Sequence, residues 1–194
     1  GEQITAQDVE RINEAVNGNY KLPQKQRRLR NIAPFLGLSG PGTLAGRLSM
    51  WHSDGSHAKL FDNEADLIDF TAARSFGIEM AEILKDKASI SPVLLYLFHR
   101  IQSSLDGSPT MIVLDEAWAL IGNAVFAPKI KDWLKVLRKL NTFVIFATQS
   151  VEDAAKSRIS DTLIQQTATQ IFLPNLKATE VYKTAFMLSE REYM

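Results

Sequence analysis

The chain has 194 residues, of which 45% are hydrophobic, and its 22 Lys and Arg residues balance 22 Asp and Glu residues. This length and apolar content suit one full domain, or one core with a helical annex, and they exclude wholesale disorder. The net charge is zero, so the chain lacks the excess of basic residues that is typical of a general nucleic-acid binder. The sequence has no apolar run long enough to span a membrane. It has no Cys, which excludes a disulfide framework and a thiolate metal site.

Both ends of the sequence resemble internal positions of a longer protein. The chain begins with Gly1 rather than Met. Near the other end, Ser189 and Glu192 read as a capping box, and the helix that they open runs out at Met194. We therefore expect a piece of a longer protein.

Residues 1–60 are predicted to form a polar helical region. Thr5 and Asp8 predict the cap of a first helix that ends near Gly18, and further helices are predicted over residues 24–36 and 43–51. Two charged clusters are also present. The basic cluster is Lys25, Arg27, Arg28 and Arg30, and it predicts a solvated helix face, with contact to nucleic acid or lipid headgroups as the alternative. The acidic cluster is Asp62, Glu64, Asp66 and Asp69, and it predicts a solvated loop and helix cap.

From residue 61 onward, strands and helices are predicted to alternate. Buried parallel strands are expected at residues 111–114, 143–147 and 170–173. A helix over 91–105 is apolar nearly all round. A second helix, over 128–140, is amphipathic, with one apolar stripe formed by Ile130, Trp133, Leu134, Leu137 and Leu140. The alternation predicts an α/β fold with a parallel sheet flanked by helices.

Two carboxylates follow the first of these strands. Met111-Ile112-Val113-Leu114 precedes Asp115 and Glu116, so both acids are expected at the carboxyl end of a buried strand, where α/β sheets bind ligands. In P-loop ATPases this pattern is the Walker B element: the Asp holds the Mg²⁺ shell through water, and the Glu polarises the water that attacks the γ-phosphate. The alternative is an ordinary strand that ends in a solvated turn.

The strand over 143–147 ends in polar residues as well. Thr148 and Gln149 follow it, and a Gln beside a Walker B strand can sense the γ-phosphate. The alternative is that these residues only cap the next helix. Two such strand tips in this order favour a RecA-like ATPase core that uses ATP and Mg²⁺, with Thr148 facing the nucleotide.

A phosphate-binding loop needs the pattern G-x-x-x-x-G-K-[ST], which the sequence lacks. Gly37 and Gly42 have the glycine spacing, but Thr43 and Leu44 follow them. We expect the loop upstream of Gly1 in the longer protein, so the 194 residues alone are predicted not to hydrolyse ATP.

Arg138 and Lys139 lie near the end of the amphipathic helix, and Arg138 falls at the edge of its apolar stripe. A guanidinium there can reach across a subunit interface as an arginine finger. The alternative is a solvated pair that complements the helix dipole.

Taken together, these elements resemble the large ATPase of type IV secretion and conjugation systems, the CagE/TrbE/VirB family. Ordered matches along nearly the whole chain carry the resemblance: Leu60-Phe61-Asp62-Asn63, Phe76-Gly77-Ile78-Glu79-Met80, the stretch 92–101, Ile112-Val113-Leu114-Asp115-Glu116-Ala117-Trp118, Leu137-Arg138-Lys139-Leu140-Asn141, Phe146-Ala147-Thr148-Gln149-Ser150 and the stretch 168–175.

The resemblance implies a Walker B role for Asp115 and Glu116 and a sensor role for Gln149, with Arg138 and Lys139 in a motif that acts at the nucleotide across subunits. Residues 1–60 would be a helical insertion, and 61–194 the C-terminal half of a RecA-like core. The implied function is an ATP-driven motor for pilus biogenesis and substrate export. It would be a cytoplasmic homo-oligomer, held at the inner membrane through other secretion components. Two alternatives stay open: a DNA-translocating coupling-type ATPase, which the zero net charge disfavours, and a docking module without turnover.

Overall fold

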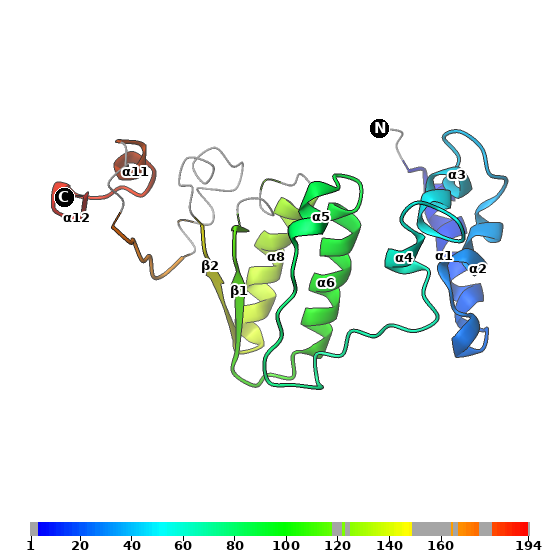
Figure 1. The fold of residues 1–194 in the computed structure, drawn as a ribbon, viewed down its shortest axis with the longest axis horizontal. Helices are drawn as coiled ribbons and strands as arrows, with labels where there is room; N and C mark the ends of the chain where they lie inside the picture. Colours follow the sequence, from blue (N-terminus) through cyan, green and yellow to red (C-terminus); the bar gives the residue numbers. More distant parts are fainter. Residues whose placement is uncertain are drawn as a thin grey trace. The chain divides into compact units, whose positions relative to one another are not determined.

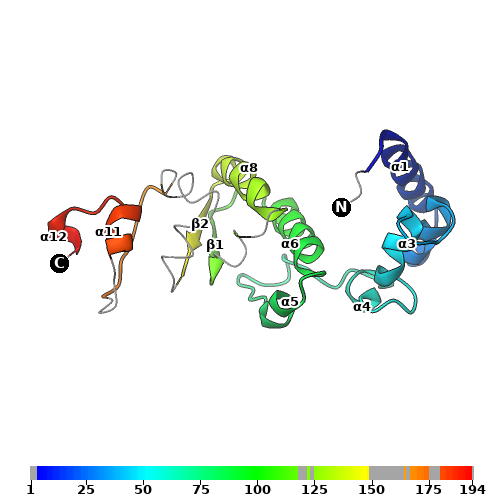
Figure 2. The ribbon, with the colours of Figure 1, turned by 90° about the horizontal axis from the view of Figure 1, so that it is seen from above.

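The computed structural model describes residues 4–117, 122, 125–148, 164, 167–174 and 180–193. The chain forms two compact units, Gly1–Ser75 and Phe76–Met194, which are described separately below (Figures 1 and 2). Composition placed the change near residue 60, whereas the first unit extends to Ser75. The roles predicted for the two regions, a helical insertion and half of a motor core, stay predictions.

The first unit is built from short helices around a small core. The buried residues are Ala15, Leu36 and Ala45, and partly buried aliphatic side chains pack around them. Its elements are α1 (Ala6–Tyr20), η1 (Gln24–Gln26), α2 (Leu29–Ile32), η2 (Ala33–Leu36), α3 (Leu44–Leu48), η3 (Ser49–Trp51) and α4 (Ala58–Phe61).

The predicted cap of α1 is confirmed. The hydroxyl of Thr5 accepts from the N–H of Asp8 at 3.2 Å, and the carboxylate of Asp8 accepts from the N–H of Thr5 at 2.9 Å. This reciprocal pair satisfies two backbone donors that the first turn of a helix leaves open. The helix continues to Tyr20, slightly past the predicted end at Gly18.

The single helix predicted over residues 24–36 is wrong, because the segment breaks into η1, α2 and η2. Arg28 adopts an extended conformation (φ −113°, ψ 156°) that interrupts the helix before α2. Pro34 then lies in the first turn of η2, and because it has no N–H it cannot donate to a carbonyl of α2, so α2 does not continue as an α-helix.

The prediction of two solvated charge groups is also wrong at its centre, since Asp62 is only 4% exposed. Its carboxylate accepts from the backbone N–H of Arg30 at 3.0 Å and the Nε of Arg30 at 2.7 Å, and from the backbone N–H of Ser53 at 2.9 Å. Arg28 donates to the Asp62 carbonyl at 2.6 Å. The basic segment and the acidic segment therefore fold onto each other, because a buried carboxylate needs hydrogen-bonded cations.

The second unit contains two strands and their covering helices. β1 (Thr110–Leu114) and β2 (Thr142–Phe146) are parallel and hydrogen-bonded, with Thr110 opposite Thr142 and Leu114 opposite Phe146. The parallel pair confirms the predicted α/β arrangement. The helices are α5 (Ala81–Lys85), α6 (Ile90–Ser104), α8 (Phe126–Lys139), α11 (Glu180–Ala185) and α12 (Glu190–Tyr193).

The core of this unit lies between one face of the strands and the helices α6 and α8 (Figure 2). Ile130, Trp133 and Leu137 of α8 are buried there, as their spacing predicted. The rings of Phe98 and Trp133 meet edge to face with their centroids 4.2 Å apart. The nearly all-round apolar character of the helix predicted over 91–105 favours burial on every side, but Leu95 and His99 of α6 are exposed.

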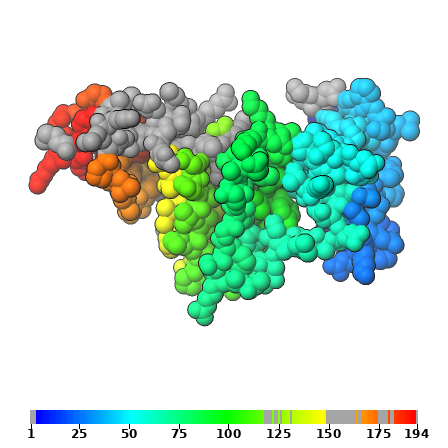
Figure 3. All heavy atoms as spheres, in the orientation of Figure 1, coloured from blue at the N-terminus to red at the C-terminus, as the bar shows by residue number. Residues whose placement is uncertain are grey.

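The second face of the strands is open among the described residues. Two cross-strand pairs are exposed there: Met111 opposite Phe143, and Val113 opposite Ile145. The yellow-green and yellow spheres of the two strands reach the surface in Figure 3. The expectation of strands buried on both sides therefore holds for one side here.

The third predicted strand, over 170–173, is wrong. Residues 167–174 form no strand, and Ile171 is 83% exposed. Apolar, β-branched composition favours extended backbone, but a strand also requires a hydrogen-bonded neighbour, and the described sheet consists of β1 and β2. Farther along, Glu192 accepts from the N–H and the hydroxyl of Ser189 at 2.9 and 2.7 Å, as the predicted capping box requires of its Glu.

Candidate functional site at the carboxyl edge of the sheet

The carboxyl ends of β1 and β2 are held together by the backbone of Ala147. Its N–H donates to the carbonyl of Leu114 at 2.9 Å, and its carbonyl accepts from the N–H of Ala117 at 3.1 Å. The two bonds bracket Asp115 and Glu116, while Ala117 is fully buried. The acidic pair is thus a turn fixed at both ends, with both residues exposed.

The backbone of Glu116 is strained within this turn. Its φ is +49°, a left-handed conformation that costs an L-residue about 1–2 kcal/mol. The carboxylate of Asp115 accepts from the N–H of Glu116 at 3.0 Å, which supports the bend. Such strain persists where the surroundings over-determine the backbone, and it concentrates at functional sites.

Thr148 follows Ala147 directly and is half-buried. The structure therefore brings Asp115, Glu116 and Thr148 to one edge of the sheet. Gln149, the predicted sensor, lies outside the described residues.

Arg138 and Lys139 lie at the opposite edge, exposed on the last turn of α8. Asn141, two residues after Lys139, accepts from the N–H of Thr110 at 3.2 Å, at the start of β1. Figure 1 shows α8 running antiparallel to both strands. A strand rises about 3.3 Å per residue, so the five residues of β1 separate the two edges by roughly 16 Å. The structure thus does not bring Arg138 and Lys139 together with the acidic turn of the same chain.

The acidic turn offers the ligand type that Mg²⁺ takes. This ion is typically bound by one or two protein carboxylates, with waters and phosphate oxygens in its remaining positions. Asp115 fits this role, because its carboxylate is exposed and the hydrogen bond from the Glu116 N–H uses one of its two oxygens, Oδ1. Among the described residues, no group of three or more His, Cys, Asp or Glu side chains forms a complete metal cage.

The sequence alone did not reveal the Ala147 bracket or the left-handed Glu116. Ala117 and Ala147 lie within the matched stretches, but their role here belongs to the backbone, which no side-chain pattern encodes.

Within the described residues, no helix has both the length and the apolar content that crossing a membrane requires.

Comparisons with known proteins agree with the resemblance seen in the sequence. The model of the TraG P-loop domain family matches residues 43–192. The chain is 36% identical over its full length to the type IV secretion system protein virB4 of Bartonella quintana (strain Toulouse), of which it covers 25%. It is 48% identical, over 78% of its length, to a probable conjugal transfer protein TrbE of Sinorhizobium fredii, of which it covers 23%.

A third relative, the type IV secretion system protein PtlC of Bordetella pertussis, is 31% identical over 92% of the chain. The chain spans about a quarter of the length of these curated relatives. The family match covers more than half of the chain and includes both strands and the acidic turn between them. The chain belongs to the TraG P-loop domain family.

Proposed function

We propose that this chain belongs to an ATP-hydrolysing motor that energises type IV secretion, for pilus biogenesis and substrate export. The observation that carries the proposal is the exposed Asp115–Glu116 turn, which Ala147 brackets at the carboxyl edge of a parallel sheet. Ligands of open α/β sheets bind at this edge. The printed names of the relatives, virB4, TrbE and PtlC, support secretion and conjugal transfer as the setting.

In this proposal the second unit is half of a RecA-like core, and each group at the edge has one task. Asp115 holds the water shell of Mg²⁺, and the carboxylate of Glu116 orients and polarises the attacking water. Thr148 and Gln149 face the nucleotide. When bound, the metal ion supplies positive charge beside the phosphates. The phosphate-binding loop comes from a region of the longer protein outside these 194 residues.

Arg138 and Lys139 act on the site of a neighbouring subunit. Because they lie at the amino edge of the sheet, they do not reach the acidic turn of their own chain, and their exposed side chains are accessible to a second copy of the chain. A homo-oligomer in which the amino edge of one subunit meets the carboxyl edge of the next would bring guanidinium and phosphate together. We place this assembly on the cytoplasmic side of the inner membrane, held there by other secretion components.

The test is a Glu116→Gln substitution in the longer protein that contains this chain. We expect phosphate release to fall by a factor of about 100 to 1,000, because Gln cannot polarise water as a carboxylate does. Binding of a fluorescent ATP analogue should persist.

Glu82→Gln is the matched control, since Glu82 is exposed and pairs with Lys85 on α5, away from the acidic turn in sequence. Its phosphate release should equal that of the unsubstituted protein. An unchanged rate in Glu116→Gln would overturn the proposal.

A further inference from the structure

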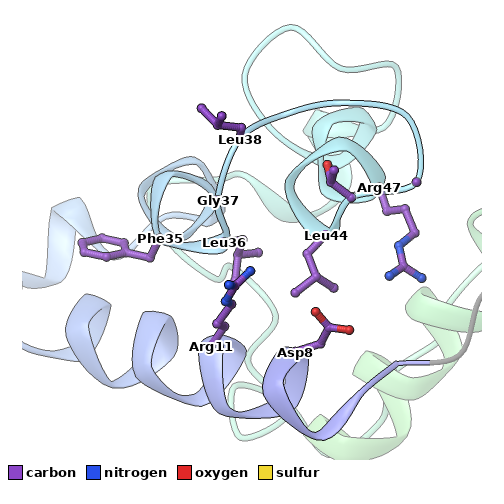
Figure 4. A pocket seen from close by; sticks show the side chains of 10 residues that line it. Asp8, Arg11, Phe35, Leu36, Gly37, Leu38, Leu44 and Arg47 are labelled. Carbon is purple, nitrogen blue, oxygen red and sulfur yellow. The ribbon is translucent and has the colours of Figure 1, made fainter.

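The first unit contains an open hollow of about 680 Å³, far from any predicted nucleotide contact in the sequence. Its walls come from α1, η2, α3 and the loop between η2 and α3 (Figure 4). This volume lies within the range of sites that hold a ligand or a short peptide segment. Most of its lining precedes residue 43, where the family match begins.

Two cations and one carboxylate face this hollow. In Figure 4 the carboxylate of Asp8 lies between the guanidinium groups of Arg11 and Arg47. Hydrogen bonds from the backbone and hydroxyl of Thr5 lower the pKa of Asp8, and both arginines lower it further, so Asp8 stays charged at neutral pH. No ion pair within 4 Å joins Arg11 or Arg47 to a carboxylate of the described residues. The hollow therefore has one positive charge in excess.

Two exposed apolar side chains, Phe35 and Leu38, point outward at the rim of the same hollow, away from Asp8 (Figure 4). Leu38 is 91% exposed and Phe35 is 61% exposed, while Leu44 lines the wall between the arginines. Gly37 has a φ of +96°, a left-handed value that favours glycine and sets the direction of the loop carrying Leu38. Large apolar side chains held at a rim beside guanidinium groups are typical of protein-docking surfaces, where Arg and aromatic residues are enriched.

We propose that this hollow docks an acidic peptide segment of a partner protein, with carboxylates on Arg11 and Arg47 and apolar side chains against the exposed Leu38 and Phe35 at its rim. Carboxylates match the planar, bidentate donors of arginine. A nucleic acid fits less well, because two cations are few for a phosphate backbone. This inference is independent of the nucleotide site.

The test uses the 194-residue chain and a fluorescent peptide that places pairs of Asp and Glu beside Leu and Phe, followed by fluorescence polarisation. Two matched peptides, one with Asn and Gln for the acids and one with Ser for the apolar residues, define the specificity. We expect the acidic-apolar peptide to bind, both matched peptides to bind more weakly, and added salt to weaken binding.

Arg11→Gln and Arg47→Gln should each weaken binding about tenfold, because each removes a charge-assisted hydrogen bond. Leu38→Ser should weaken it as well, without disturbing the fold of so exposed a residue. Arg74→Gln removes the same charge from an exposed position of the same unit outside the hollow, and its affinity should be unchanged.

The proposal would be overturned if the Arg11 and Arg47 variants bound the peptide as tightly as the unsubstituted chain does, or if the acidic-apolar peptide did not bind at all. So would tighter binding of a single-stranded DNA oligonucleotide that the same two substitutions abolish. A circular dichroism spectrum identical to that of the unsubstituted chain establishes that each variant is folded.

Discussion

The N–H of Ala117 donates to the carbonyl of Ala147 at 3.1 Å, across the carboxyl ends of the two parallel strands. This bond closes the turn that displays Asp115 and Glu116. The position of the acidic pair therefore depends on β2 as much as on β1. It also explains how Glu116 is kept in a left-handed conformation, since the chain must return to the partner strand within two residues.

The strain at Glu116 predicts an opposition between activity and stability. Glu116→Gly should raise the free energy of unfolding by up to about 1 kcal/mol, because glycine adopts positive φ at little cost. Glu116→Gln keeps the side-chain size and the strain, and should unfold within about 0.5 kcal/mol of the unsubstituted chain. Thermal unfolding of the two variants compares them directly. A glycine variant less stable than the Gln variant would show that the turn stores no strain.

The buried Asp62 predicts a pH dependence in the first unit. Burial raises the pKa of Asp62, but hydrogen bonds from the backbone of Ser53 and Arg30 and from the Arg30 side chain outweigh it, so the pKa is lowered overall. A carboxyl group with a lowered folded-state pKa stabilises the fold above its unfolded value of about 4. That stability is lost as pH falls through the folded-state pKa.

Asp62→Asn should remove this acid dependence and destabilise the unit by about 1–3 kcal/mol at neutral pH, because the hydrogen bonds from Arg30 and Arg28 lose their charged acceptor. Denaturant unfolding followed at several pH values measures both effects. Glu64→Gln is the control, since the Glu64 side chain is 78% exposed and its pair with Arg28 should contribute less than about 1 kcal/mol. Equal losses in the two variants would contradict the buried ion pair.

The core of the second unit predicts a steep cost for shortening α8 side chains on its inner face. Ile130 is fully buried against α6 and the strands, so Ile130→Ala should lower the free energy of unfolding by about 2–5 kcal/mol. Val136→Ala, on the half-exposed side of the same helix, should cost less than about 1 kcal/mol. Urea unfolding followed by Trp fluorescence reports on the pair. Similar midpoints for both variants would exclude the predicted packing.

The position of Arg138 predicts complementation between subunits. In the longer protein, Arg138→Ala should lower ATP turnover about 1,000-fold or more, as loss of an arginine finger does. Mixing it with Glu116→Gln subunits should restore some of the activity, because some interfaces then combine an intact Glu116 with an intact Arg138. Phosphate release by the mixture measures the rescue. A mixture no more active than its components would leave Arg138 a solvated helix residue.

Local sequence patterns determined secondary structure in both units. The two apolar strands, the buried stripe of Ile130, Trp133 and Leu137, and the Thr5 cap were all predicted. Each of these depends on residues a few positions apart, whose side chains share a face or a first turn. The acidic pair at a strand end was predicted for the same reason.

Tertiary structure decided what depends on residues distant in sequence. Arg28 and Arg30 meet Asp62 across 34 and 32 positions, so two groups predicted as solvated are joined at one buried carboxylate. The bracket at Ala147 and the left-handed Glu116 follow from strand pairing. The same strand pairing separates Arg138 from the acidic turn. Residues 170–173 have no paired neighbour in the described sheet and therefore form no strand. Hydrogen bonds between distant segments satisfy buried polar groups in ways that no local pattern encodes.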